Sequence, residues 1–351
     1  MLVVFVTTRV LLHHVPMYTC ETFRGTEPLY SQHQRLHQQQ QHHQQQQCPA
    51  PMSRPSATSA IAAVGGLSTV DPQEYGAVKV LNLTKTRTHR RITLAMNPPL
   101  FEIPGFLAPD ECDHIIRLAQ EQGLEDAATA GWEESVVHTD DLQDVSSRDR
   151  TGQTTFLDRR GDPLLAAIEE RVSILTELPL TLIKESEDLQ VAHYGTQGHY
   201  HAHFDTDSDW RLDDPEVKPC CFQIEPPRVG SRCIFCRFAT VMMYLNDVEE
   251  GGETAFPVAD LADPDISAEN ENLSFNCYKA SVVVKPKKGT AVFWYNNYVD
   301  EDTGWIGEHD PFSLHGGCDV IRGEKWIANL WISAPTYRQR HYVHDDLHRE
   351  N

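Results

Sequence analysis

The sequence predicts an α+β domain dominated by a β-sandwich or a β-barrel. Two amphipathic segments with helical periodicity come first, at residues 110–124 and 162–179, and short runs rich in β-branched and aromatic residues follow from residue 189. Helices followed by a series of strands are typical of this fold class. Dense apolar patterning extends from about Pro98 to Pro335, and this span of roughly 240 residues fits one large β-rich domain.

The first helical segment reads DECDHIIRLAQEQGL. Its apolar residues Ile115, Ile116, Leu118 and Leu124 recur at helical spacing, which favours one buried face. Acidic side chains occupy the first turn, where the helix dipole stabilises them. Gly123 stands where a C-terminal cap is expected. We expect this helix to cover one face of a sheet.

The second helical segment is DPLLAAIEERVSILTELP. Pro179 is expected to end it, because proline cannot continue a helix. Like the first helix, it is expected to serve as a structural cover for the sheet. Its predicted apolar face consists of Leu164, Leu165, Ile168, Val172 and Ile174.

The expected strands lie in the second half of the chain. β-branched and aromatic residues dominate these runs, and turn signals separate them. The runs are LQVAHYG at 189–195, FATVMMYLND at 238–247, SVVVKPKKGTAVFWYN at 281–296 and KWIANLWISA at 325–334. The acidic stretch at 259–272 is expected to be an exposed insertion.

Residues 1–92 are expected to lie outside the packed domain, which we place at residues 93–345. The run at 31–51 is rich in glutamine and histidine and has almost nothing to bury, which is typical of disorder. Residues 52–91 are interpreted as linker. The first sixteen residues are apolar but interrupted by Arg9, and they are shorter than the ~20 residues of a membrane helix. They are therefore a weak signal or anchor at best.

The net charge of −21 argues against a nucleic-acid surface, which needs a basic stripe. An acidic, solvated exterior is the simpler interpretation. Two glycosylation sequons begin at Asn82 and Asn272, and they favour a lumenal address. The sequence does not define an oligomeric state.

The chain has nine cysteines, and five of them fall between residues 220 and 277. Cys233 and Cys236 have the spacing of half a zinc site, but a second Cys-x-x-Cys is missing. We therefore favour an insertion pinned by disulfides in an oxidising compartment over zinc. The five are Cys220, Cys221, Cys233, Cys236 and Cys277.

The segment Gly-His-Tyr-His-Ala-His-Phe-Asp at 198–205 carries the chemistry. In a strand, alternate side chains share a face, so His199, His201, His203 and Asp205 are expected to project together. Two imidazoles and one carboxylate form the ligand set of non-haem Fe(II) oxygenases. Taken alone, the pattern also permits a zinc site or a cupin-type pair.

A distal histidine and a lysine complete the pattern. His315 lies in Ser-Leu-His-Gly-Gly, and Lys325 follows ten residues later. Lys325 alternates with Ile327, Asn329 and Trp331 on one face of the expected strand. A lysine on an inward face implies an anionic ligand, because a buried ammonium needs a compensating charge.

These motifs resemble the prolyl 4-hydroxylase family, and within it the transmembrane branch of the endoplasmic reticulum. The resemblance spans about Pro98 to Ala334. It is carried by FEIPGFLAPDEC, LQVAHYGTQGHYHAHFD, RFATVMMYLNDVEEGGETAFPVAD, KKGTAVFWYN and SLHGGCDVIRGEKWIANLWI. It implies a double-stranded β-helix, or jelly-roll, with flanking helices. It also implies an Fe(II)- and 2-oxoglutarate-dependent dioxygenase that hydroxylates peptidyl proline at C4.

The resemblance implies a role for each matching residue. His203, Asp205 and His315 match the iron ligands, and Lys325 matches the residue that binds the distal carboxylate of 2-oxoglutarate. His199 and His201 match no ligand position, and they are assigned to supporting or groove roles. Dioxygen is the further substrate, succinate and carbon dioxide are released, and ascorbate is expected to restore oxidised iron.

The cosubstrate pocket and the peptide groove are assigned in the same way. Tyr194 matches a tyrosine that hydrogen-bonds 2-oxoglutarate, and Thr254 matches a position in the cosubstrate pocket. Tyr200, Arg237 and Trp331 match residues that line the groove for a proline-containing peptide. An aromatic groove suits an extended, polyproline-like chain. Core packing is the alternative interpretation for Tyr200 and Trp331.

The sequence departs from the transmembrane relatives at residues 125–148, which contain no EF-hand loop, so calcium binding is not expected. Two other functions stay open on the sequence alone. One is the same chemistry on another protein residue, such as lysine or a non-collagen proline. The other is a catalytically silent or zinc-bearing barrel that acts as a binding module, although such a barrel has no need of both the ligand set and Lys325.

Overall fold

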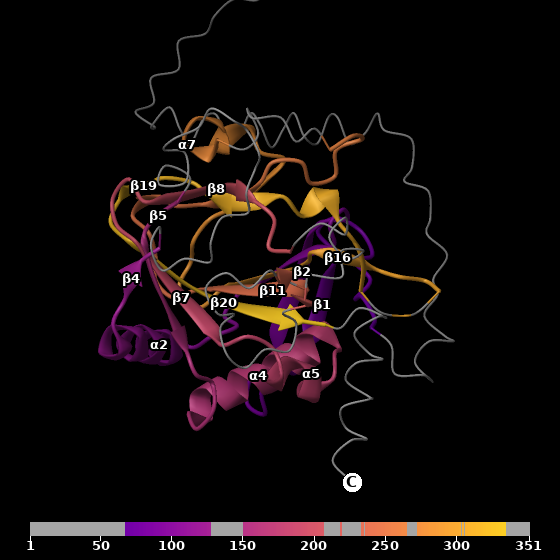
Figure 1. Ribbon diagram of the computed structural model, residues 1–351, viewed down its shortest axis with the longest axis horizontal. Helices are drawn as coiled ribbons and strands as arrows, with labels where there is room; N and C mark the ends of the chain where they lie inside the picture. The colour runs from indigo at the N-terminus through magenta and orange to yellow at the C-terminus, as the bar shows by residue number, and fades with distance from the viewer. Residues whose placement is uncertain are drawn as a thin grey trace, which may run out of the picture. The chain divides into compact units, whose positions relative to one another are not determined.

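The computed structural model describes residues 67–127, 150–206, 218–219, 233–234, 236–264, 272–302, 304 and 306–334. Within these ranges the fold is a sandwich of two antiparallel sheets with the longer helices on one outer face (Figure 1). The expected α+β class with a jelly-roll core is confirmed. The described residues do not include the Gln/His-rich run, the first sixteen residues, Cys220 or Cys221.

The larger sheet has nine strands in the order β1-β2-β3-β15-β11-β20-β7-β6-β4. Its central strands β11 and β20 are buried almost throughout, because helices cover one of their faces and the second sheet covers the other. In sheet order the strands are Val78–Leu81, His89–Ala95, Leu100–Ile103, Ala291–Tyr295, Arg237–Tyr244, Lys325–Ser333, Leu189–Tyr194, Gln153–Leu157 and Glu125–Asp126.

The smaller sheet has five strands in the order β14-β13-β18-β8-β5. In sheet order they are Val282–Val284, Thr254–Phe256, His315–Gly317, His199–His203 and Arg150–Thr151. Three two-stranded pairs complete the described strands: β9 (Lys218–Pro219) with β10 (Cys233–Ile234), β12 (Glu250–Gly251) with β19 (Val320–Arg322), and β16 (Asn297–Val299) with β17 (Ile306–His309).

Helix α2 (Pro109–Gln122) forms where the sequence predicts it. Glu111 in its first turn accepts a hydrogen bond from the main-chain nitrogen of Ala108 (2.7 Å). The main-chain nitrogen of Gly123 donates back to Ala119 at the other end, and Gly123 has a φ of +94°. A positive φ is readily adopted by glycine alone, which explains this residue at the helix end.

Helix α4 (Pro163–Thr176) begins at Asp162, whose carboxylate accepts from the main-chain nitrogens of the first turn. Two details of its prediction are wrong. Ile174 is 48% exposed, and Leu175 is the buried residue of the last turn. The helix also ends before Pro179, because Glu177 adopts a left-handed conformation. Pro179 instead precedes the short helix α5 (Leu180–Lys184).

Two cores hold these layers together. The larger core packs α2 and α4 against the outer face of the nine-stranded sheet, through residues such as Ile115, Val172 and Val241. The second core lies between the two sheets and includes Tyr194, Trp294 and Ile327. Ligand-binding side chains between the sheets are therefore separated from the helices by a complete layer of strand backbone.

Strands β1 and β2 correct the expected domain boundary. All four residues of β1 pair with β2 at the edge of the larger sheet, whereas the sequence pattern predicts linker at 52–91 and a boundary at residue 93, inside β2. The apolar pattern is sparse here because β1 is an edge strand, with Val78 and Val80 exposed. Leu83 is nevertheless buried in the larger core.

A small cap lies on the outer side of the five-stranded sheet, built from α7 (Leu273–Asn276) and the 3-10 turn Cys277–Lys279. The disulfide between Cys277 and Cys318 ties it to the chain three residues after His315. A second short 3-10 turn, Pro311–Ser313, leads into β18. Cys236 is also disulfide-bonded. A disulfide framework is therefore present, and the alternative of a zinc site at Cys236 is wrong.

No helix in the described residues is long and apolar enough to cross a membrane.

Candidate active site

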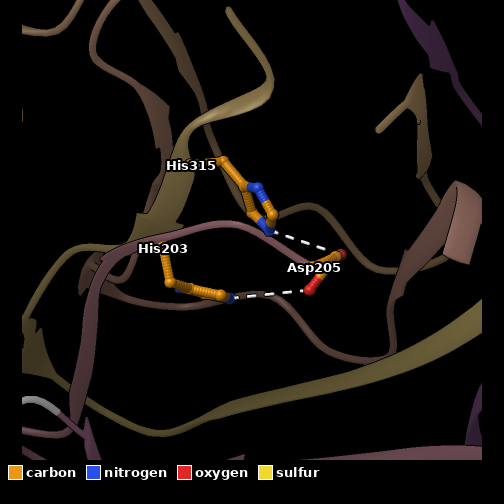
Figure 2. A group of neighbouring side chains, drawn as sticks. All are labelled: His203, Asp205 and His315. Carbon is orange, nitrogen blue, oxygen red and sulfur yellow. Dashed lines mark ion pairs between the residues drawn. The ribbon is translucent and has the colours of Figure 1, made fainter. Parts of the chain in front are cut away.

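His203, Asp205 and His315 converge at one end of the space between the sheets (Figure 2). His203 on β8 and His315 on β18 are direct neighbours across an antiparallel pair, and Asp205 follows β8 by two residues. His203 Nε2 lies 3.6 Å from Asp205 Oδ1, and His315 Nε2 lies 3.5 Å from Asp205 Oδ2. These residues, far apart in the sequence, thus offer three ligand atoms to one point.

The main chain fixes the tautomer of both histidines. His203 Nδ1 lies 2.8 Å from the carbonyl oxygen of His201, and His315 Nδ1 lies 2.8 Å from that of Ser313. A carbonyl oxygen only accepts, so each Nδ1 carries a proton, and in the neutral imidazole Nε2 keeps its lone pair. Both lone pairs face Asp205. Two neutral imidazoles and a carboxylate fit Fe(II) in the facial-triad arrangement.

The electrostatics of the triad agree with this chemistry. Burial lowers the pKa of His315 to about 4, so its imidazole is neutral at pH 7. Burial by itself acts to raise the pKa of Asp205, but His315, His203 and Arg237 outweigh it and hold that pKa below its usual range. A neutral imidazole and an ionised carboxylate are the states that bind a divalent metal.

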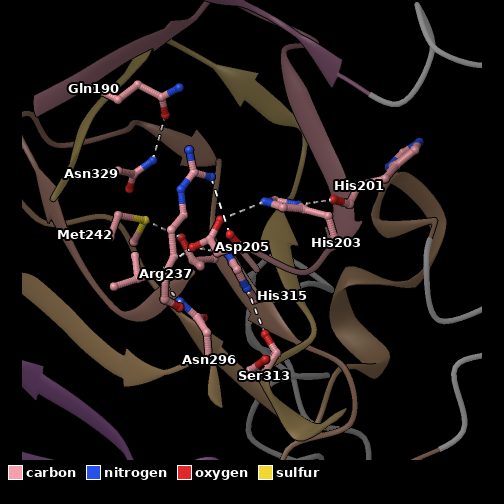
Figure 3. A network of polar contacts seen from close by, with 12 residues as sticks. Gln190, His201, His203, Asp205, Arg237, Met242, Asn296, Ser313, His315 and Asn329 are labelled. Carbon is pink, nitrogen blue, oxygen red and sulfur yellow. Dashed lines mark hydrogen bonds and ion pairs between the residues drawn. The ribbon is translucent and has the colours of Figure 1, made fainter. Parts of the chain in front are cut away.

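His199 and His201 do not join the triad, and the expectation that all four side chains share a face is wrong. One extra residue interrupts the pairing of β8 with β18 between Tyr200 and His203, and a β-bulge of this kind breaks the alternation of faces. His199 and His201 stack on each other, with ring centroids 4.5 Å apart. His201 points away from Asp205 (Figure 3).

The close packing of β18 explains Gly316, the first of the two glycines that follow His315. A Cβ atom on Gly316 would lie 2.6 Å from the carbonyl oxygen of Tyr200 and 2.7 Å from the side chain of Leu273. Only glycine therefore allows both β8 and the cap to approach β18 this closely at position 316. Ser274 in the cap also donates a hydrogen bond to Asp319 (2.6 Å).

Lys325 lies inside the sandwich, as its alternation predicts. It is 3% exposed, sits directly opposite Tyr194 on β7, and has its Nζ 6.0 Å from the centroid of that ring. Within the described ranges it forms no salt bridge. Burial lowers the pKa of Lys325 to about 8, against the opposing charge of Glu253. The ammonium is thus charged at pH 7 and poorly compensated by neighbouring side chains.

Thr254 on β13 borders the same region. Its hydroxyl receives a hydrogen bond from Tyr244 (2.7 Å), and both side chains are buried. The Lys325 Nζ lies 5.8 Å from the centroid of the Tyr244 ring. The three residues assigned to the cosubstrate from the sequence therefore lie close together, with Tyr244 beside them. They are Tyr194, Thr254 and Lys325.

Tyr200 lies directly against the triad. Its ring stacks on His203 with centroids 3.6 Å apart. On the other strand, β5, the Arg150 guanidinium lies 4.7 Å from the centroid of the Tyr200 ring. Burial raises the pKa of Tyr200, so its hydroxyl stays protonated. The bulge in β8 makes this arrangement possible, because it turns Tyr200 and His203 to the same side.

Arg237 and Trp331 form a second cluster next to Asp205. The Arg237 guanidinium lies 3.5 Å from the Trp331 ring centroid and donates two hydrogen bonds of 2.7 Å to Glu187. It also donates to the main-chain oxygen of Asp205 (3.4 Å). The Trp331 indole Nε1 is buried and has no hydrogen-bond partner in the described part of the chain.

Sequence reasoning missed three residues that complete these clusters: Arg150, Glu187 and Tyr244. Arg150 and Glu187 stand in polar segments with no strand pattern of their own. Tyr244 had a usable signal, because a tyrosine that ends a fully buried strand needs a partner for its hydroxyl. A second group, Glu253 with Cys277 and Cys318, also converges. Its cysteines are disulfide-bonded and are not available as ligands.

Comparisons with known proteins agree with this site. The model of the 2OG-Fe(II) oxygenase superfamily matches residues 189–333. The transmembrane prolyl 4-hydroxylase of Mus musculus is 31% identical over 385 residues, covering 83% of this chain and 74% of that protein. Prolyl 4-hydroxylase 2 of Arabidopsis thaliana is 36% identical over 244 residues, covering 70% of each.

A solved viral collagen prolyl hydroxylase from Paramecium bursaria Chlorella virus-1 is 25% identical. It covers 67% of this chain and 96% of its own, with a TM-score of 0.40. The assignment rests on the sequence relatives and the superfamily match, not on this superposition. The fold and the triad define a 2-oxoglutarate- and Fe(II)-dependent oxygenase. Within that superfamily, the chain belongs to the prolyl 4-hydroxylase family.

Proposed function

We propose that this enzyme hydroxylates proline residues of a peptide or protein at C4, with Fe(II), 2-oxoglutarate and dioxygen. When bound, iron and 2-oxoglutarate supply the oxidative chemistry that ends in succinate, carbon dioxide and the hydroxylated product. The observation that carries the proposal is the convergence of His203, Asp205 and His315 beside a buried, poorly compensated lysine. The names of the relatives support proline as the target.

His203 and His315 would hold the metal through Nε2, and Asp205 through a carboxylate oxygen. Because main-chain carbonyls orient both imidazoles, the ligands need little rearrangement before metal binds. Three protein ligands on one side leave the other side for the cosubstrate and dioxygen.

Lys325 would bind the distal carboxylate of 2-oxoglutarate. Its ammonium is buried and charged at pH 7, and a bound carboxylate offsets the cost of burying that charge. Tyr194 and Thr254 line the same space and would contribute hydroxyl groups. Tyr244 holds Thr254 in place through its hydrogen bond.

Tyr200, Arg237 and Trp331 would position the proline-containing segment. Flat aromatic surfaces suit the ring of proline and the extended polyproline conformation. The indole Nε1 of Trp331, which has no hydrogen-bond partner among the described residues, would supply a donor for a peptide carbonyl that otherwise loses its hydrogen bond to water. Glu187 fixes the guanidinium of Arg237 through two hydrogen bonds.

We further propose a lumenal address in the endoplasmic reticulum, with ascorbate as the reductant that restores oxidised iron. Disulfides at Cys236, Cys277 and Cys318 support an oxidising compartment. The name of the transmembrane relative is compatible with a membrane anchor. We propose that the oxygenase domain includes at least Val78 to Ser333.

The test is succinate release by the purified protein with Fe(II) and 2-oxoglutarate across a panel of peptides. The panel contains proline in collagen-like and other contexts, and lysine-containing peptides without proline. Mass spectrometry should locate a gain of one oxygen on proline. His203→Ala should abolish turnover, whereas His114→Ala on the outer helix α2 should not. Turnover no higher than that of His203→Ala on every peptide would contradict the proposal.

A further inference from the structure

A chain of buried hydrogen bonds ends on the carboxylate of Asp205. The Trp294 indole Nε1 donates to Asn296 Oδ1 (2.8 Å), and Asn296 Nδ2 donates to Thr240 Oγ1 (2.9 Å). Thr240 Oγ1 then donates to Asp205 Oδ2 (2.7 Å). Asn296 and Thr240 are both fully buried. Figure 3 shows Asn296 and Asp205 within one polar network.

The direction of this chain is fixed at its far end. An indole nitrogen can only donate, so the Asn296 oxygen must face Trp294 and its amide nitrogen must face Thr240. The same amide donates to the main-chain oxygen of Arg237 (3.1 Å), which agrees with that orientation. Because the Thr240 oxygen accepts from Asn296, its single hydrogen is directed to Asp205.

This arrangement distinguishes the two oxygens of Asp205. Each oxygen lies beside one triad histidine, Oδ1 at 3.6 Å from His203 Nε2 and Oδ2 at 3.5 Å from His315 Nε2, but Oδ2 also receives the Thr240 hydrogen. A carboxylate that bound iron through both oxygens would occupy one of the positions that 2-oxoglutarate and dioxygen require. An oxygen engaged by a short hydrogen bond is a poorer metal ligand than its free neighbour.

We propose that Thr240, oriented by Asn296 and Trp294, is a positioning residue that restricts Asp205 to binding metal through one oxygen. The inference rests on the proposed function, since it concerns the same metal centre. A structural role alone would explain why the buried polar groups are paired. It would not make the metal centre sensitive to the presence of one hydroxyl group.

The test uses the full-length protein loaded with Co(II), whose visible absorption reports the number and geometry of its ligands. Thr240→Val preserves the shape of the side chain and removes the hydroxyl. We expect it to weaken Co(II) binding by about 10- to 100-fold, as for other groups that orient metal ligands, and to change the absorption band. Thr240→Ser restores the hydroxyl and should restore both. Thermal unfolding verifies the fold of each variant.

Asn296→Asp provides a second variant of nearly identical shape. Its carboxylate only accepts, so it draws the Thr240 hydrogen away from Asp205. We expect the same change in the Co(II) band, and no further loss when it is combined with Thr240→Val. This variant also serves as the test if Thr240→Val does not fold.

The outcomes separate the two proposals. If the wild type binds Co(II) and both variants match it in affinity and spectrum, the positioning role is overturned and the proposed function stands. If the wild type takes up no Co(II) that depends on His203, the metal centre itself is overturned. Weakened binding with an altered band, restored by Thr240→Ser, supports the inference.

Discussion

The guanidinium of Arg237 lies 3.5 Å from the centroid of the Trp331 ring, and Glu187 holds it there through two hydrogen bonds. Arg237 thereby covers one face of the indole. In the pairing of β11 with β20, Arg237 lies opposite Ser333. A planar guanidinium stacks on an aromatic ring in a way that an ammonium cannot reproduce.

Arg237→Lys should therefore raise the KM for a proline-containing peptide by roughly 10-fold, which corresponds to ~1.4 kcal/mol, because the stacked surface and both bonds to Glu187 are lost. The KM for 2-oxoglutarate should stay within a factor of two. Steady-state kinetics with each substrate varied in turn provides the measurement. An equal rise in both values would show that Arg237 supports the whole site and not the peptide groove.

Lys325 predicts how cosubstrate affinity depends on pH. Its folded-state pKa is lowered to about 8, so the ammonium is present below pH 8 and is lost as the pH rises through that value. The affinity for 2-oxoglutarate should accordingly fall above pH 8, as measured by calorimetry between pH 6.5 and 9.5. Lys325→Arg keeps its charge over that range and should bind with little dependence on pH. A wild type with constant affinity would exclude Lys325 as the anchor.

His89 predicts a loss of stability in acid. Its ring is buried on β2. Burial lowers its pKa below the usual value. Below pH ~6.5 the unfolded chain binds a proton that the folded chain does not accept, so stability is full above that pH and falls below it. Urea unfolding at pH 7.5 and pH 5 should show the loss. His89→Leu should reduce the pH dependence.

The disulfide between Cys277 and Cys318 closes a loop with a sequence separation of 41. Replacing both cysteines with serine should lower the free energy of unfolding by about 2–4 kcal/mol, because the unfolded chain gains freedom. Denaturant unfolding of the double variant against the wild type measures the change. The double variant is preferred to either single one, which would leave a reactive thiol. Coincident unfolding midpoints would contradict the prediction.

The structure distinguishes the two glycosylation sequons. Asn82 is exposed, whereas Asn272 has its side-chain oxygen buried and Ser274 of its sequon donates to Asp319. When the protein passes through a secretory pathway, Asn82→Gln should remove the mass released by a glycosidase. Asn272→Gln should leave that mass unchanged. A glycan on Asn272 would show that the cap folds after modification.

Local pattern predicted the layers well, and the resemblance to the prolyl 4-hydroxylase family singled out His203, Asp205 and His315, which the structure brings together. Strand periodicity identified β7, β11, β15 and β20, and it placed Lys325 on the inner face. The bulge in β8 was beyond prediction, since one extra residue relative to β18 leaves no trace in the local alternation. The pairing of Cys277 with Cys318 was also beyond reach, because disulfide connectivity depends on tertiary contacts.

Strand β1 shows a different limit. Its valines are exposed, so the strand lacks the apolar alternation that marked the others, and only its pairing with β2 reveals it. The polar contacts of Thr240 and Asn296 were hidden for the opposite reason. Both residues stand within or beside runs of apolar residues. The sequence of such a run does not show which hydrogen-bond partners a single polar side chain has in the folded protein.

The bulge in β8 has a consequence for how this region tolerates change. A regular strand could direct either Tyr200 or His203 towards the interior, but not both. The additional residue lets Tyr200 and His203 face one side of the strand, while His199 and His201 face the other. Pairing of the same residues with β18 without the bulge would turn Tyr200 and His203 to opposite faces, even if every side chain named here were retained. The geometry of this stretch therefore depends on its register with β18 as much as on the identity of its residues.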